Sequence, residues 1–303
     1  MHLAFRAASA LACLTLVAAG TMTPAHAASA PPFDGTVWIG PNIITPASPS
    51  DLLSTEPTGR GNRTTYDRRS GWVTQDAYLF IARFTGSKPA EIIVNPEFGS
   101  QDAAATQAGF FARILGQLPR SCRTQVDALW IHPGNEDLGG GNRSILIHSN
   151  FANGDQAFLE EALLHECAHT SLDWDWGGTV ERAKWAAQAA SDPGFISSYA
   201  ADNPASEDVA ETFVPYLAWK LGAASGYTAA QLAAISQQIS NRLAYLDSLA
   251  LNLAPLIAAE PSTTPKIRPG SACKKAFIGH TTTTVKFGTL TCRRVGNAIR
   301  WQR

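Results

Sequence analysis

The chain has little that would place it in a membrane or on a nucleic acid. Of its 303 residues only 16% are charged, and 24 Lys and Arg against 25 Asp and Glu leave a net charge of −1. Beyond the N-terminus, no apolar segment approaches the ~20 residues that a membrane-spanning helix needs. The composition therefore indicates no membrane span, and without a basic excess it indicates no nucleic-acid partner.

The N-terminus has the pattern of a secretory signal peptide. A weakly basic start precedes the apolar run Ala7–Ala19, and the Ala-His-Ala sequence at residues 25–27 fits an A-x-A cleavage site. The apolar run is too short to remain as a membrane anchor. We expect residues 1–27 to be removed, so that a chain beginning at Ala28 is secreted to the extracellular or periplasmic side.

Cysteine is scarce. Of five cysteines, Cys13 leaves with the signal peptide, and an even set of four remains. In an exported chain this indicates two disulfides. Cys273 and Cys292 share one short tail and are expected to pair, which leaves Cys122 for Cys167 by elimination. A reduced, buried Cys167 is the alternative.

The net charge conceals two parts of opposite sign. Residues 266–303 hold nine Lys and Arg and no acid; since Arg6 leaves with the signal peptide, residues 28–265 carry 14 basic against 25 acidic residues, a net of −11. A Pro/Thr/Ser linker at 261–265 separates the parts. We expect a catalytic domain at 71–260 and a small basic β module at 266–303. The module would attach to an anionic cell-surface polymer or pack on the acidic domain.

The order of the expected elements indicates an α+β fold. Residues 28–70, rich in Pro, Ser, Thr and Gly, predict an extended N-terminal segment. Apolar patterning then predicts strands followed by helices. The expected strands are 78–84, 91–95, 126–132 and 144–148, with 276–278, 283–287 and 289–291 in the module, and the expected helices are 101–118, 156–172 and 228–250.

The sequence His-Glu-Cys-Ala-His at residues 165–169 is the most specific pattern of the chain. On a helix, His165 and His169 lie on one face, where two imidazoles can bind one Zn²⁺ ion. Glu166 would stand beside that ion and could take a proton from a water. Cys167 points away from this face. The alternative is an ordinary amphipathic helix with two surface histidines.

A catalytic zinc ion needs a third protein ligand. Glu207 and Glu211 lie four residues apart on a helix that Asn203-Pro204 is expected to start. A metal ligand and a carboxylate that accepts a hydrogen bond from a ligating histidine would explain this acidic pair on an apolar helix, whereas a solvated first turn explains Glu207 alone. Asp175 is the second candidate ligand, but Leu172 stands where that geometry needs a glycine.

Together these motifs resemble the zincin metallopeptidases, and among them the gluzincins of the lethal-factor and Mlc-titration-factor type. The resemblance covers residues 164–214 and implies that His165, His169 and Glu207 bind zinc. It also implies that Glu166 is the general base and that Tyr199 donates to the oxyanion.

The same resemblance implies a zincin-like catalytic domain that binds an extended peptide along a sheet edge. Arg143–Ser149 is the expected edge, and the glycines at 139–141 would let the backbone approach the substrate closely.

The sequence thus predicts a secreted, zinc-dependent metallopeptidase. A zinc amidase acting on cell-wall peptides would use the same residues. A non-enzymatic surface-binding protein with a structural metal site would instead show four protein ligands.

Overall fold

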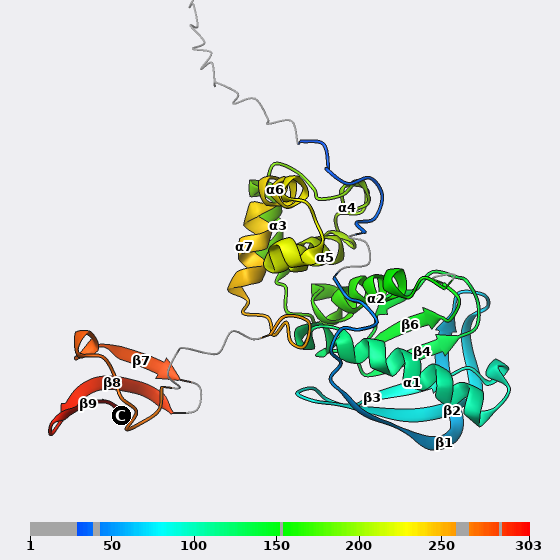
Figure 1. Cartoon of the computed structure of the whole chain (residues 1–303), viewed down its shortest axis with the longest axis horizontal. Helices are drawn as coiled ribbons and strands as arrows, with labels where there is room; N and C mark the ends of the chain where they lie inside the picture. The colour runs from blue at the N-terminus through cyan, green and yellow to red at the C-terminus, as the bar shows by residue number, and fades with distance from the viewer. Residues whose placement is uncertain (1–28, 39–42, 152–153, 259–266, 285–286) are drawn as a thin grey trace, which may run out of the picture.

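The computed structural model describes residues 29–38, 43–151, 154–258, 267–284 and 287–303 (Figure 1). The expected signal peptide and the expected linker at 261–265 lie outside these residues. Among the helices of the described part, none has the length and apolar character that crossing a bilayer requires.

A six-stranded mixed sheet forms the base of the α+β fold, with the strand order β1-β2-β3-β4-β6-β5. Strands β1 to β3 pair antiparallel, β3, β4 and β6 pair parallel, and β5 closes one side antiparallel to β6. The strands are β1 (Leu52–Asp67), β2 (Gly71–Phe84), β3 (Ala90–Val94), β4 (Ala128–His132), β5 (Gly139–Gly141) and β6 (Ser144–His148).

The N-terminal segment continues into this sheet, which differs from the expected boundary at residue 71. β1 pairs with β2 from Leu52↔Phe84 to Asp67↔Gly71, so that boundary falls inside a hairpin. The apolar pattern does not predict β1, because only Thr65 and Asp67 of its 16 residues are buried. Strand β2 likewise begins seven residues before the expected start at Tyr78.

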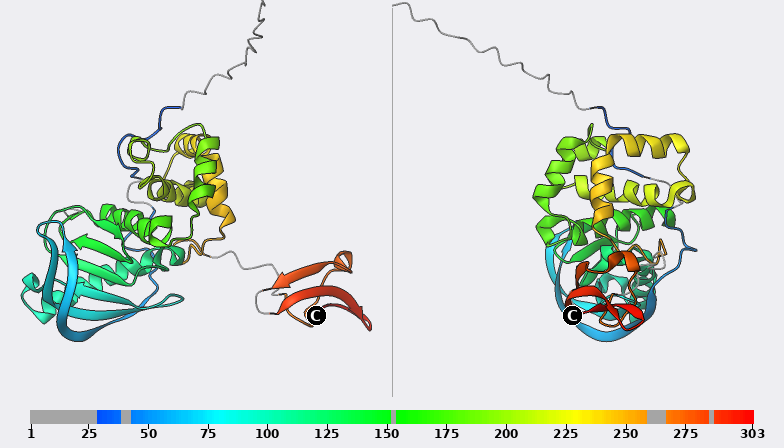
Figure 2. Two further views of the ribbon diagram at one scale, coloured as in Figure 1. Left: turned by 180° about the vertical axis from the view of Figure 1, so that it is seen from behind. Right: turned by 90° about the vertical axis from the view of Figure 1, so that its left-hand side faces the viewer.

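Helices cover one face of the sheet. α1 (Gln101–Gln117) packs on β1, β2 and β3, and α2 (Gln156–Ser171) packs on β5 and β6 (Figures 1 and 2). Phe80, Ile92, Leu129 and Ile145 lie in register across the sheet and belong to the main hydrophobic core. The opposite face carries only a small cluster of Ala77, Leu79 and Ile93, against which Ala128 and Trp130 pack.

Helix α2 confirms the expected helix at 156–172 to within one residue. The carboxylate of Asp155 accepts hydrogen bonds from the backbone N–H groups of Ala157 and Phe158, which caps the first turn. The predicted disulfide between Cys122 and Cys167 is present and ties α2 to the short helix η2 (Arg120–Arg123). This link lies on the side of α2 that faces the core, since Cys167 is fully buried.

The helices after α2 form a second layer (Figure 2). Helix α5 packs on α2, and α3 packs on α7. The bounds are α3 (Arg182–Ser191), α4 (Ser198–Asp202), α5 (Asp208–Leu221), α6 (Ala229–Gln238) and α7 (Ser240–Ser248).

Two expected helix boundaries in this layer are wrong. Asn203 ends α4 by donating its backbone N–H to Tyr199, so α5 starts only at Asp208. The expected single helix at 228–250 breaks at Ile239, because the carboxylate of Asp192 accepts the backbone N–H groups of Asn241 and Arg242 and starts a new helix there.

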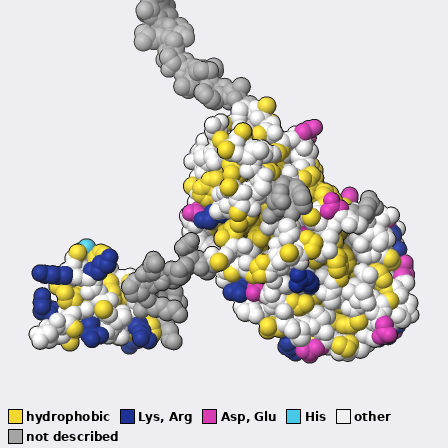
Figure 3. Space-filling model, viewed as in Figure 1, with side chains coloured by type: hydrophobic (Ala, Val, Ile, Leu, Met, Phe, Trp, Pro, Cys, Tyr) yellow, Lys and Arg dark blue, Asp and Glu magenta, His cyan; other side chains and the backbone are white. Residues whose placement is uncertain are grey.

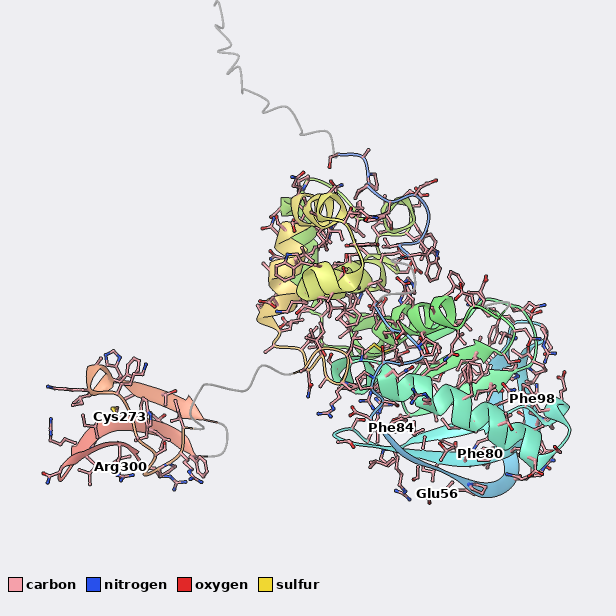
Figure 4. The ribbon with its side chains drawn as sticks, in the orientation of Figure 1. Glu56, Phe80, Phe84, Phe98, Cys273 and Arg300 are labelled. Atoms are coloured by element: carbon pink, nitrogen blue, oxygen red, sulfur yellow. A yellow bond between two sulfur atoms is a disulfide. The ribbon has the colours of Figure 1, made fainter. Side chains whose placement is uncertain are left out.

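The C-terminal module is a three-stranded antiparallel sheet of β7 (Thr281–Thr284), β8 (Gly288–Val295) and β9 (Ala298–Gln302). Its core consists of Leu290, Cys292 and Trp301. The predicted disulfide between Cys273 and Cys292 is present, and Figure 4 labels Cys273 in this module. The strand expected at 276–278 is instead the short helix η5 (Lys275–Phe277), and the pattern missed β9.

Candidate metal centre and active site

Three side chains converge where α2 meets α5. His165 and His169 lie one turn apart on α2, and Glu207 precedes the first residue of α5. The Nε2 atoms of the two histidines are 3.1 Å apart, and the Oε2 atom of Glu207 lies 3.4 Å from the first and 3.1 Å from the second. In the described part of the chain, these three residues form the one group of His, Cys, Asp and Glu able to hold a metal ion.

The spacing of these donor atoms fits one metal ion of zinc's size. Tetrahedral zinc, bound at about 2.0–2.1 Å, holds its ligand atoms about 3.3 Å apart. Two imidazole nitrogens and one carboxylate oxygen are also a donor set that zinc accepts in proteins. The donor triangle is therefore suited to a bound ion without rearrangement of the side chains.

Each histidine has a carboxylate near its Nδ1 atom, the ring nitrogen that does not face the other donor atoms. The Nδ1 atom of His165 lies 3.4 Å from Oε1 of Glu211, and Nδ1 of His169 lies 3.9 Å from Oδ2 of Asp173. Both carboxylates are buried. Such carboxylates orient a ligating imidazole and select the tautomer whose Nε2 is free for the metal.

Glu211 also connects the site to the N-terminal segment. Its Oε2 atom accepts a hydrogen bond of 2.6 Å from the hydroxyl of Ser197 and one of 3.0 Å from the backbone N–H of Val37. Because these bonds engage Oε2, the Oε1 atom remains directed at His165. The N-terminal segment thus helps to hold the imidazole of His165 in place.

The electrostatics of the site favour a positive charge. Burial opposes the charged form of His169, but the nearby carboxylates of Asp173, Glu207 and Glu166 outweigh it and raise the pKa of His169 to about 10. Burial opposes the charged form of Glu207 too, yet the two imidazoles hold the pKa of this carboxyl well below its usual range. A metal ion would supply the cation that these carboxylates stabilise.

His165, His169 and Glu207, called the metal-binding group below because their donor atoms could hold an ion, open into a cavity of about 630 Å³. Glu166 and Tyr199 line this cavity together with His165, His169 and Glu207. Burial, followed by the charges of Glu207, Glu211 and Glu166, raises the pKa of the Tyr199 hydroxyl, so this group keeps its proton and can donate it in a hydrogen bond. A carboxylate, a phenol and the three metal-binding side chains thus face one space.

Strand β5 forms the other wall. A Cβ atom added to Gly140 would overlap the carbonyl oxygen of Glu166, so only glycine lets this strand lie directly on α2. The hydroxyl of Thr170 accepts the N–H of Gly141 at 2.9 Å and fixes the contact. The expected edge at Arg143–Ser149 is wrong, because β6 lies between β4 and β5; the strand at this edge of the sheet is β5.

Asp175 does not join the metal-binding group. It lies in the short helix η3 (Trp174–Trp176), is exposed, and forms an ion pair of 2.5 Å with Arg182. Asp173, two residues earlier, was not predicted as a site residue. Its position four residues after His169, on the same helix face, was the available signal.

None of the protein-family models, curated proteins or solved structures with which the chain was compared matches it. The chemical interpretation of the site accordingly depends on its own geometry.

Proposed function

We propose that this chain is a secreted, zinc-dependent metallopeptidase. The observation that carries the proposal is the donor triangle of His165, His169 and Glu207, which faces a cavity shared with Glu166. A structural zinc site has four protein ligands. In the described residues the group has three, which leaves a position on the cavity side for a water and a substrate carbonyl.

Each side chain has a role that its position supports. A zinc ion at the triangle would polarise the carbonyl of the scissile bond and acidify a nearby water. Glu166 takes the proton of the attacking water and delivers it to the leaving amine. The protonated Tyr199 donates a hydrogen bond to the carbonyl oxygen as it gains negative charge. Glu211 and Asp173 keep the two imidazoles oriented.

Strand β5 is suited to holding the substrate. It is the last strand at one edge of the sheet and lies against the backbone of Glu166. An extended peptide that adds to this edge would lie alongside the metal-binding group. Secretion is supported by the two disulfides, which persist in oxidising compartments.

The C-terminal module has a separate proposed role, which is attachment to an anionic polymer. Its described Lys and Arg side chains are all exposed (Figure 3). Arg293 on β8 stands directly opposite Arg300 on β9. Like charges in such cross-strand positions repel each other, and an anion bound between them would relieve the repulsion.

The test of the peptidase proposal is metal analysis joined to an activity assay. The purified chain should contain close to one zinc ion per molecule and cleave unfolded protein. A chelator should abolish cleavage, and added zinc should restore it. Full activity after the metal has been removed would contradict the proposal. Cleavage of cell-wall peptide fragments but not of unfolded protein would identify an amidase that uses the same side chains.

A further inference from the structure

An aromatic surface adjoins the cavity of the metal-binding group on the other side of β5. A second cavity of about 210 Å³ is lined by Tyr66, Trp72, Trp130 and Trp176. Tyr66 packs edge-on against Trp72 with ring centroids 5.5 Å apart, and Trp72 packs in the same way against Trp130 at 5.7 Å. We call these four residues the aromatic shelf.

The shelf exposes much of its apolar area. Trp72 is 61% exposed and Trp176 is 44% exposed. The described residues that line this second cavity include no Asp or Glu, and their one cation, Arg68, already donates to backbone carbonyl oxygens. The first cavity is lined by Asp137, Asp173 and Asp175 as well as by Glu166 and Glu207. The two neighbouring cavities therefore suit different chemical groups, and the shelf suits an uncharged, apolar side chain.

The register of the sheet shows which face each glycine of β5 presents. Gly140 faces α2, where its hypothetical Cβ would overlap Glu166. Gly139 lies opposite Leu146, which in turn lies opposite Trp130, so these three residues share the face of the shelf. A Cβ atom on Gly141 would lie 2.7 Å from the Trp176 ring. Gly139 and Gly141 thus face the shelf, and Gly140 faces the helix.

We propose that the aromatic shelf is a substrate subsite for an aromatic or large aliphatic side chain, an inference that rests on the proposed peptidase function. Successive side chains of a strand point to opposite faces. In a peptide paired with β5, the residue opposite Gly140 projects towards α2 and the metal-binding group. Its neighbour, opposite Gly139 or Gly141, projects onto the shelf. The enzyme therefore selects a large apolar residue next to the residue that faces the metal-binding group.

An extended peptide can occupy the shelf and the first cavity together. The two cavities share Arg68, Gly139, Gly140 and Trp176, so one extended occupant can fill both. The guanidinium of Arg68 already donates hydrogen bonds to the carbonyl oxygens of Asp137 and Leu138 at 2.8 and 2.6 Å. It therefore fixes the entry to β5, where a paired backbone would begin.

The test measures binding separately from cleavage. The probes are alanine/serine heptapeptides in which a single phenylalanine is moved from position to position, with an all-alanine/serine peptide as reference. Binding is measured with the zinc-loaded Glu166→Gln chain, which should hold at least one phenylalanine peptide about fivefold more tightly than the reference. Adding Trp72→Ala should remove this preference, because that ring supplies exposed contact area.

Two further variants make the result decisive. Phe110→Ala removes another exposed aromatic ring, 39% exposed, from α1 and should keep the preference. Gly139→Leu should abolish it by occupying the shelf, since a Cβ there meets only side-chain atoms, at 3.4 Å or more.

The outcomes separate the two proposals. If Trp72→Ala and Gly139→Leu leave the preference unchanged, or if no preference exists, the shelf is not a peptide subsite. Equal selection of oligosaccharides by the shelf would also overturn it. If the preference is present but the unmodified chain cleaves no peptide, the peptidase proposal fails, and the shelf is a peptide-binding site without a cleavage role.

Discussion

The part of the chain before the linker, residues 29–258 and here called the main domain, differs from the C-terminal module in where its charged side chains lie. In the main domain, Glu207, Glu211 and Asp173 lie at the junction of two helices, with Glu211 and Asp173 buried and directed at two histidines. In the module, the described cations lie at the surface of a three-stranded sheet. We have proposed one small cation for the buried carboxylates and histidines of the first region, and a large anion for the exposed cations of the second.

The two regions also differ in how they are held together. The main domain has a core that extends from Val37 to Leu253 and includes the site helix α2. Among its described residues, the module buries Leu290, Cys292 and Trp301, and the disulfide between Cys273 and Cys292 links it covalently. A segment this small cannot bury enough apolar area to fold by packing alone. The first region can therefore hold side chains in the fixed positions that a metal site requires, whereas the second offers mainly an exposed surface.

The largest expected effect on zinc content and peptide cleavage comes from replacing a histidine of the main domain, compared with replacing one of the module. His169→Ala should lose most of the bound zinc and reduce peptide cleavage by ~10³-fold or more, because a metal ligand is removed. His280→Ala, in the exposed part of the module, should change neither quantity. Full zinc occupancy in His169→Ala, measured by elemental analysis, would contradict the assignment of the site.

The next effect tests which carboxylate completes the triangle. Glu207→Ala should weaken zinc binding by more than ~100-fold, beyond the loss that follows removal of a supporting residue. Asp175→Ala should leave the affinity nearly unchanged, since its carboxylate pairs with Arg182 instead. Competition with a chromogenic chelator gives both affinities. The reverse result would make Asp175 the third ligand.

A smaller effect is expected from the carboxylate behind His169. Asp173→Ala should weaken zinc binding by about 10- to 100-fold, because the imidazole loses the acceptor that orients it. Glu181→Ala provides a control, since the side chain of this exposed glutamate forms an ion pair with Lys184 at the start of α3. Equal zinc affinities in the two variants would reduce Asp173 to the role of capping the helix η3, where it accepts the N–H of Asp175.

The smallest effect on catalysis should come from removing the module. A chain that ends at Pro261 should cleave small soluble peptides as fast as the full chain, since every proposed site residue precedes it. Its binding to an anionic polymer should be lost, and that of the full chain should weaken as salt rises, because exposed charges are screened beyond ~8–10 Å at physiological ionic strength. Loss of peptide cleavage would mean instead that the module supports the main domain.

The sequence predicted those parts of the fold that depend on neighbouring residues. Helix α2 and strand β6 both follow from local patterns. Elements that depend on contacts between distant segments were not predicted. Asp192 starts α7 from about 50 residues away, and the polar strand β1 is recognisable only through its pairing with β2.

The same difference between local patterns and distant contacts applies to the residues of the site. The spacing of His165 and His169 and the position of Glu211 could be inferred along single helices. The shelf could not, because Tyr66, Trp72, Trp130 and Trp176 come from four separate elements. His132 and His148 lie 3.3 and 3.9 Å from the carboxylate of Asp67 and do not belong to the metal-binding group.

The most direct test of the central claim compares Glu166→Gln with the unmodified chain in one experiment that measures zinc content and peptide cleavage together. The variant keeps the shape of the side chain and the three metal-binding residues but cannot accept a proton. We predict that it holds close to one zinc ion per molecule and cleaves ~10²- to 10⁴-fold more slowly. Unchanged cleavage at full zinc occupancy would show that Glu166 is not the base and would contradict the account.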